Sequence, residues 1–351
     1  MDQNVNFRPD STGRLTSEAS KKYFSRIGLA CFILGAVSLL ISISGNLIVR
    51  ELFPWVLSNP IASTLFSYGL TVVSLYVFAF PIAALAVGPL PVSNPIKEKM
   101  KTSHVFAGLC ISFMLTFVGS YASTFIYSLF ASNTASSTTT QSATMGDAEL
   151  IISSIFLALV LPILEELVFR KFLCSRLLPL GEGYAVFFSA IIYSLMGELY
   201  QIPHAFLLGL FFAFIYVKTG KIIYSLIFHC AINLYNGVLG LYMTAKLPID
   251  EILEIFESDV SDTEKMAQLS PYMDAMQIYL WSSAALIGLI IAGFIICYRA
   301  IKRERFALES GIIPPSKQNR ISNVLCAGGI AAAFGYVGIK IVLPLYVERF
   351  L

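Results

Sequence analysis

The feature that most constrains this chain is the length of its uncharged apolar stretches, the first of which covers the 23 residues from 27 to 49. The hydrocarbon core of a bilayer is about 30 Å thick, and an α-helix of roughly 20 apolar residues crosses it. Inside lipid every backbone N–H and C=O must be paired, and a helix achieves this within one segment. Charged residues make up only 13% of the chain, against roughly 25% in soluble domains. The sequence therefore predicts an all-α polytopic membrane protein.

About eight to nine transmembrane helices are expected from these stretches. The candidate spans are 27–49, 61–87, 105–130, 149–170, 183–197, 204–217, 222–245, 276–298 and 321–346. Two of them, 183–197 and 204–217, are short, and helices of about 15 residues rise only roughly 22 Å. We expect these two either as tilted spans or as a hairpin that reaches part-way into the bilayer. The last span is rich in small residues, which favours close packing against another helix.

The charges in the connections predict the orientation of the chain. The first 26 residues hold five Lys or Arg, the stretch 97–101 holds three, and the connection 299–320 holds six. The alternate connections are poor in basic residues: the stretch 131–148 has none, and 246–274 has two against eight Asp or Glu. The positive-inside rule then predicts a cytoplasmic N-terminus and an external C-terminus.

This alternation divides the chain into a cytoplasmic N-terminal segment, a first group of transmembrane helices, a central core, an acidic external loop and a last group of transmembrane helices. The expected boundaries are 1–26, 27–148, 149–245, 246–275 and 276–351. The first group of helices ends in a low-complexity Ser/Thr-rich stretch, 132–146, which we expect to be a flexible external loop. Within the acidic loop, 248–269 is predicted to form an external amphipathic helix with a loop.

Two adjacent carboxylates lie in the apolar segment LPILEELVFRKFL, residues 161–173. A charge at bilayer depth costs several kcal/mol, so it marks a candidate functional site. Glu166 and Arg170 are spaced i, i+4 and can pair on a helix, while Glu165 points about 100° away. A carboxylate without a cation in a dry site is suited to act as a general base. The alternative is a pair of interfacial glutamates neutralised by the basic residues that follow them.

A second polar pair lies in the apolar segment IIYSLIFHCAINLYNG, residues 222–237. His229 and Asn233 are spaced i, i+4 and therefore share one face of a helix. Imidazole can bind a metal or donate to an oxyanion, and the Asn amide can also donate. The alternative is that both side chains bridge neighbouring helices by hydrogen bonds, as is common in membrane bundles.

Three elements of the chain, in order and spacing, resemble the motifs of one membrane-protein family. The elements are Glu165-Glu166-x-x-x-Arg170, Tyr193-Ser-Leu-Met-Gly197 and His229-x-x-x-Asn233. They resemble the CPBP or Abi family, which contains CAAX prenyl endopeptidases and bacteriocin-processing or bacteriocin-immunity membrane proteins. The resemblance covers roughly residues 150–238 and implies a four-helix catalytic core that hydrolyses a peptide bond inside the membrane. It also implies a bacterial plasma membrane, because most of the family is prokaryotic.

The resemblance assigns a role to each motif residue. It implies that Glu165 is the base that activates water, with His229 and Asn233 as oxyanion donors or metal partners, while Glu166 and Arg170 orient the helix. A metalloprotease of this kind would hold Zn²⁺ through Glu165 and His229. A metal-free glutamate mechanism is equally compatible with the resemblance.

The second motif departs from the family pattern, which places a histidine four residues after the aromatic residue. Here that position is Gly197, so either glycine replaces the histidine or a one-residue gap removes it after Met196. The loss of one acid–base group typically costs about 10²–10⁴ in rate. His204, at the start of the next predicted helix, lies at similar depth and is a candidate to complete the site. The alternative is that His204 forms only local hydrogen bonds at the helix start.

Three functions follow from these patterns. The first is an intramembrane endopeptidase acting on a membrane-associated protein or peptide. The second is a non-catalytic member of the same fold, such as a scaffold or an immunity-type protein. The third is a transporter or channel in which buried Glu, His and Asn side chains line a polar path. The lipid bilayer is an expected partner in each case, and no feature of the chain indicates nucleic acid as a partner.

Overall fold

The computed structural model describes residues 7, 9–130, 146–317 and 320–350. The described residues form helices, with no strand beyond one isolated antiparallel bridge between Gly181 and Ser310. This confirms the all-α prediction. The predicted Ser/Thr-rich loop lies, except for Gly146, outside the described residues.

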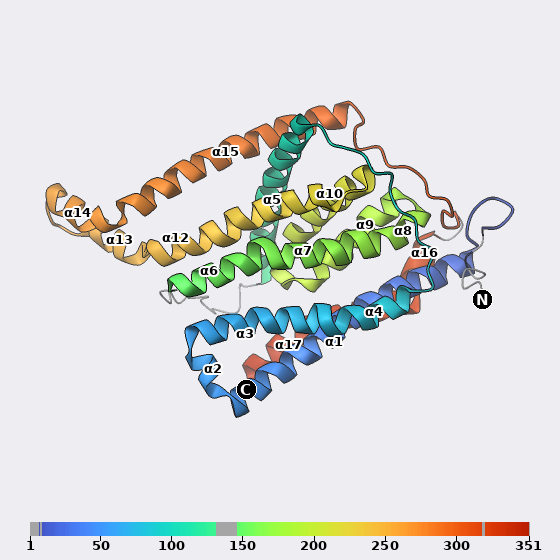
Figure 1. The fold of residues 1–351 in the computed structure, drawn as a ribbon, viewed down its shortest axis with the longest axis horizontal. Helices are drawn as coiled ribbons and strands as arrows, with labels where there is room; N and C mark the ends of the chain where they lie inside the picture. The colour runs from blue at the N-terminus through green and yellow to red at the C-terminus, as the bar shows by residue number, and fades with distance from the viewer. Residues whose placement is uncertain (1–6, 8, 131–145, 318–319, 351) are drawn as a thin grey trace.

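The α-helices run along the chain in the order shown in Figure 1. They are α1 (Ser17–Leu52), α2 (Pro54–Ser58), α3 (Pro60–Val72), α4 (Phe80–Val87), α5 (Thr102–Phe130), α6 (Asp147–Ile155), α7 (Leu161–Glu165), α8 (Ser175–Leu177), α9 (Glu182–Met196), α10 (Ile202–Thr219), α11 (Ile222–Asn233), α12 (Gly240–Lys246), α13 (Ile249–Glu257), α14 (Asp262–Leu269), α15 (Met273–Lys302), α16 (Arg320–Leu325) and α17 (Gly328–Phe350).

Seven helical segments in the described part of the chain are long and apolar enough to cross a membrane. They are Ser17–Leu52, Pro60–Val87, Thr102–Ser128, Asp147–Leu180, Ile202–Thr219, Ile222–Lys246 and Asp262–Lys302. The short predicted spans correspond to α9, with 15 residues, and α10, with 18. The chain is therefore an integral membrane protein with several spanning helices. α1 begins before its apolar stretch because Thr16 caps it by accepting a hydrogen bond from the Ala19 amide.

π-helical segments connect α-helices within the long spans. They are Val73–Ala79, Phe156–Val160, Glu166–Cys174 and Leu234–Leu239. Such segments are rare in helices and are often found at functional sites. Two of them lie directly before and after α7, so the pair of glutamates stands at a junction between helical types.

The helices pack in two groups that are visible in Figure 1. In one group α1 packs along α17 and α4, and in the other α10 packs between α9 and α5, with α15 against α5. The segment Glu166–Cys174 contacts α9, α10 and α11, so helices from the central part of the chain surround it. Aromatic contacts join the two groups, including Phe24 of α1 with Phe188 of α9 at a ring-centroid distance of 5.1 Å.

The α9–α10 contact depends on one glycine. A Cβ atom at Gly209 of α10 would lie 3.0 Å from Ala190 Cα and 3.1 Å from Tyr193 Cδ1, both on α9. Small residues allow helix backbones to approach closely in membrane proteins, where packing and not water drives association. Gly209 therefore brings α10 against the half of α9 that carries Tyr193.

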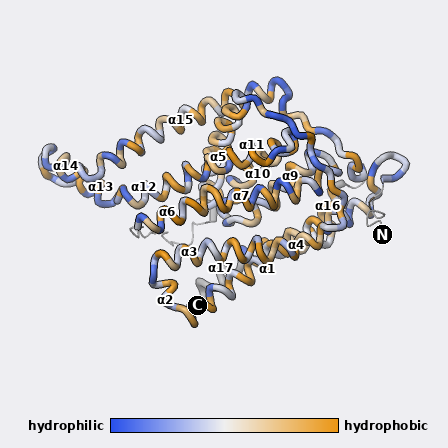
Figure 2. The backbone as a smooth tube through the Cα atoms, in the orientation of Figure 1, coloured by the Kyte–Doolittle hydropathy of each residue, from blue (hydrophilic) through white to orange (hydrophobic). Residues whose placement is uncertain are grey.

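The acidic stretch forms two short helices, α13 and α14, where one amphipathic helix with a loop was predicted. The helix breaks because Ser258 and Ser261 adopt extended backbone conformations. Leu247, Ile252, Leu269 and Ala275 form a small apolar cluster beneath this turn. Figure 2 shows hydrophilic residues both around α13 and α14 and in the connection that follows the other end of α15.

Candidate active site

The residues of the first and third motifs meet where three helical segments converge. Glu165 is the last residue of α7, Glu166 is the first residue of the following π-helical segment, and His229 lies in α11. α11 packs against both segments that carry the glutamates. Positions separated by more than 60 residues in the chain therefore share one site.

His229 lies between the two carboxylates. Its Nδ1 is 3.1 Å from Glu166 Oε1, and its Nε2 is 3.4 Å from Glu165 Oε2. The residue is 3% exposed, and Glu166 is fully buried. Each ring nitrogen thus faces a different glutamate, and the ring orientation is determined by two contacts.

Arg170 is fully buried and holds Glu166 from the other side. Its Nε is 3.5 Å from Glu166 Oε2, as the i, i+4 spacing predicts. Its Nη1 donates to Ser189 Oγ at 2.9 Å, and that hydroxyl donates to the Phe169 carbonyl at 2.9 Å. The guanidinium also lies 5.0 Å from the centre of the Tyr193 ring, within range of a cation–π contact. Arg170 therefore ties the glutamate helix to α9.

Glu165 differs from Glu166 in its surroundings. Its side chain is 23% exposed, so it is the carboxylate that water or a substrate can reach. The Oε2 atoms of both glutamates are buried and have no hydrogen-bond partner among the described residues. The two carboxylates therefore differ in exposure and in the ion pair that only Glu166 makes with Arg170.

Asn233 lies one turn after His229, but its amide points to the backbone of another segment. Its Nδ2 donates to the Leu157 carbonyl at 2.9 Å. That carbonyl lies in the π-helical segment Phe156–Val160, where its i+5 partner is Pro162, which has no N–H. A side chain from a neighbouring helix satisfies such a carbonyl in a membrane protein. Within the described residues no hydrogen bond joins Asn233 to the glutamates or to His229.

His204 lies in the first turn of α10, near the site but without a direct hydrogen bond to it. It interacts electrostatically with His229, and its Nε2 atom is buried with no hydrogen-bond partner in the described part of the chain. Its backbone is packed tightly against α5, since a Cβ atom at Gly119 would lie 2.6 Å from His204 Cα. The role assigned to His204 from its position in the sequence stays a prediction.

The second motif reaches the site through its aromatic residue. Tyr193 Oη is 3.4 Å from His229 Nε2, while Gly197, after the end of α9, is exposed. Lys340 of α17 donates to the carbonyl of Gly197 and, at 3.2 Å, to that of Leu195. Sequence reasoning missed the hydroxyl of Tyr193 and the lysine. The available signal for the first was a tyrosine where the motif has phenylalanine.

The side chains of this site do not fit a zinc ion. Catalytic zinc is usually held by three protein ligands. His229 presents Nδ1 to Glu166, which leaves Nε2 and the Glu165 carboxylate as two donors on the open side. Across the residues that the structure describes, no three His, Cys, Asp or Glu side chains are grouped so that they could hold a metal ion.

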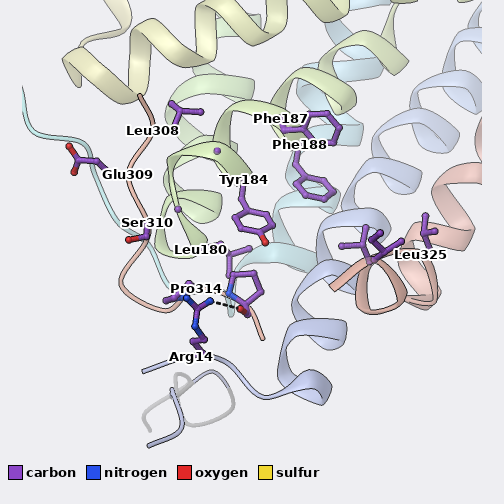
Figure 3. A pocket seen from close by; sticks show the side chains of 15 residues that line it. Arg14, Leu180, Tyr184, Phe187, Phe188, Leu308, Glu309, Ser310, Pro314 and Leu325 are labelled. Carbon is purple, nitrogen blue, oxygen red and sulfur yellow. Dashed lines mark hydrogen bonds between the residues drawn. The ribbon is translucent and has the colours of Figure 1, made fainter. Parts of the chain in front are cut away.

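A cavity of about 610 Å³ lies at the other end of α9 and is separate from this site (Figure 3). Tyr184, Phe187 and Phe188 form one wall, and Arg14 lies at its edge, donating to the Pro315 carbonyl at 3.2 Å. None of the motif residues lines this cavity. The cavity is therefore not part of the site that contains the glutamates.

Comparison with known proteins identifies the class of the central segment. Residues 147–235 match the model of the type II CAAX prenyl endopeptidase Rce1-like family. This match confirms the resemblance that the motifs indicated. No curated protein and no solved structure matches the chain.

Proposed function

We propose that the chain is an intramembrane endopeptidase in which Glu165 activates a water molecule. The observation that carries the proposal is that Glu165 is the partly exposed carboxylate of the pair, with its Oε2 atom 3.4 Å from His229 Nε2. Glu166 is neutralised by Arg170 and holds the imidazole, so Glu165 is the carboxylate left for acid–base chemistry. Its partial exposure admits water and a peptide.

In the proposed reaction a water molecule hydrogen-bonded to Glu165 attacks the carbonyl carbon of the scissile peptide. The carboxylate takes the proton as the C–O bond forms, and the carbonyl oxygen becomes an oxyanion. The C–N bond then breaks, and Glu165 returns the proton to the departing amine nitrogen. One group serves as base and then as acid, so no external proton donor is required.

His229 supplies the electrophilic side of this reaction. Its Nδ1 faces Glu166 and its Nε2 lies on the open side of the site beside Glu165. With Nδ1–H donating to Glu166, the Nε2–H of the imidazolium can donate to the oxyanion. Asn233 would join as a second donor only if its amide left the Leu157 carbonyl.

We propose a membrane-associated protein or peptide as the substrate. The matched family is described as a prenyl endopeptidase, so a prenylated CAAX peptide is the first substrate to test. The proposed location is the bacterial plasma membrane with the N-terminus in the cytoplasm, where the basic connections favour it.

The test is hydrolysis of a fluorogenic peptide by the purified full chain in liposomes. Glu165→Gln keeps the shape of the side chain but removes the base, and a rate loss of about 10²–10⁴ is expected. Glu198→Gln, the same change at an exposed position, is the matched control and should keep full activity. Equal rates for the wild type and Glu165→Gln would contradict the proposal. A zinc chelator should leave the rate unchanged, because the donor set does not fit zinc.

A further inference from the structure

Tyr193 contributes a half-buried hydroxyl to the site from the helix of the incomplete motif. Its Oη is 3.4 Å from His229 Nε2, and it also interacts with the Glu165 carboxylate. These are the two groups that the proposed reaction places around the scissile carbonyl. In the family pattern the missing histidine would stand at position 197, at the end of α9. Tyr193 lies one turn earlier on the same helix, and its hydroxyl approaches the same site.

The ring of Tyr193 is held rigidly. Its centre is 5.2 Å from that of Phe169 and 6.1 Å from that of His229, with interplanar angles of 72° and 89°. The guanidinium of Arg170 lies 5.0 Å from the ring centre, and Gly209 allows α10 to close over the ring edge. The hydroxyl therefore has a defined position relative to His229.

All of these ring contacts would be kept by phenylalanine. Burying a phenol oxygen has a desolvation cost that a phenyl ring does not have, and buried Tyr hydroxyls normally find a polar partner. Here the polar groups in reach are His229 and Glu165. The hydroxyl therefore contacts the two groups that the proposed reaction uses.

We propose that the Tyr193 hydroxyl is the hydrogen-bond donor that, beside His229, stabilises the oxyanion in place of the absent second-motif histidine. The inference rests on the proposed function, in which Glu165 activates water. The phenol O–H donates without losing its proton, so the balance of the reaction is unchanged. A preorganised donor aimed at developing charge in a dry site is worth about 10²–10³ in rate.

The test is the Tyr193→Phe variant in the liposome assay, with kcat and KM measured separately. We expect kcat to fall about 10²–10³-fold with little change in KM, since the hydroxyl acts on the transition state. Tyr184→Phe is the matched control: it removes a hydroxyl from the same helix at the separate cavity and should leave kcat unchanged. A kcat for Tyr193→Phe that equals the wild-type value would overturn the inference.

Comparing Tyr193→Phe with Glu165→Gln and the wild type separates this inference from the proposed function. If Glu165→Gln is inactive while Tyr193→Phe is fully active, only the role of Tyr193 fails. If the wild type does not hydrolyse the peptide, or if Glu165→Gln stays active, the proposed function fails and this role fails with it. The ¹⁵N resonance of His229 Nε2 in full-length protein checks the contact without an assay: it should shift in Tyr193→Phe, and an unchanged resonance would count against the hydroxyl.

Discussion

At the scale of single residues, the two adjacent glutamates differ because their neighbours differ. Glu166 is buried against Arg170 and His229 Nδ1, whereas the Glu165 side chain is partly exposed and faces His229 Nε2. The arginine is in turn held by Ser189. The surroundings therefore make Glu166 the buried, structural carboxylate and leave Glu165 as the candidate for acid–base chemistry.

Removing Arg170 should destabilise the protein more than removing both members of its ion pair. Arg170→Met leaves the Glu166 carboxylate buried without its cation, which typically costs about 3–5 kcal/mol. The double variant Glu166→Gln/Arg170→Met removes both charges and should recover part of that loss. Unfolding in mixed micelles measures the difference, and equal stability of the single variant and the wild type would contradict the arrangement.

Asn233 and Pro162 should show coupled effects on stability. Asn233→Leu leaves the Leu157 carbonyl without a donor, and an unsatisfied buried acceptor costs about 1–3 kcal/mol. In a Pro162→Ala background the backbone amide of residue 162 can supply the hydrogen bond. The same Asn233→Leu change should then cost less. A double-mutant cycle measures this coupling, and strictly additive losses would show that the two residues act independently.

At the scale of elements, the elbow between α9 and α10 is stabilised from outside its own hairpin. Lys340 of α17 donates to the carbonyls of Leu195 and Gly197, which have no further helical partners at the end of α9. A cation at a helix C-terminus also interacts favourably with the helix dipole. The C-terminal helix therefore stabilises the end of the helix that carries Tyr193.

Replacing Lys340 should loosen the end of α9. Lys340→Met removes the donor but keeps an unbranched side chain, and amides near 194–197 should exchange faster, by a factor corresponding to about 0.5–1 kcal/mol. Lys302→Met, at the end of α15, is the control with the same change at an exposed position. Hydrogen exchange of the full chain measures both. Exchange in this stretch that matches the wild type would exclude a stabilising role for the lysine.

At the scale of the whole molecule, Figure 2 shows hydrophilic residues at both ends of α15. One end carries the acidic helices α13 and α14, and the other leads into the basic connection towards α16. The positive-inside rule predicts that the basic end lies in the cytoplasm. The two ends should therefore be on opposite sides of the membrane.

Labelling of introduced cysteines tests this orientation in intact cells. Ser261 and Ala307 are both exposed and lie at the two ends of the molecule. A membrane-impermeant maleimide should label Ser261→Cys above the unsubstituted chain and should label Ala307→Cys only after the cells are opened. The reverse pattern would show that the N-terminus is external.

Much of the fold and part of the site could be read from local patterns. Apolar length predicts a membrane helix because the bilayer has a defined thickness, and the i, i+4 spacing predicts the Glu166–Arg170 pair because both residues share one helix. The two motifs around the glutamates and His229 indicated the family whose model matches residues 147–235. Each of these inferences depends on neighbours in the chain or on the solvent.

The remaining features depend on how distant helices pack, and no local pattern encodes that. His229 meets Glu166 across 63 residues, Asn233 meets Leu157 across 76, and Lys340 meets Leu195 across 145. The sequence by itself determined a membrane-spanning all-α chain with a polar site in its centre. Only the tertiary structure decided which glutamate is partly exposed, where the Asn233 amide donates and that the Tyr193 hydroxyl reaches His229. The reason is that side-chain contacts between helices arise only when the backbones are placed against one another.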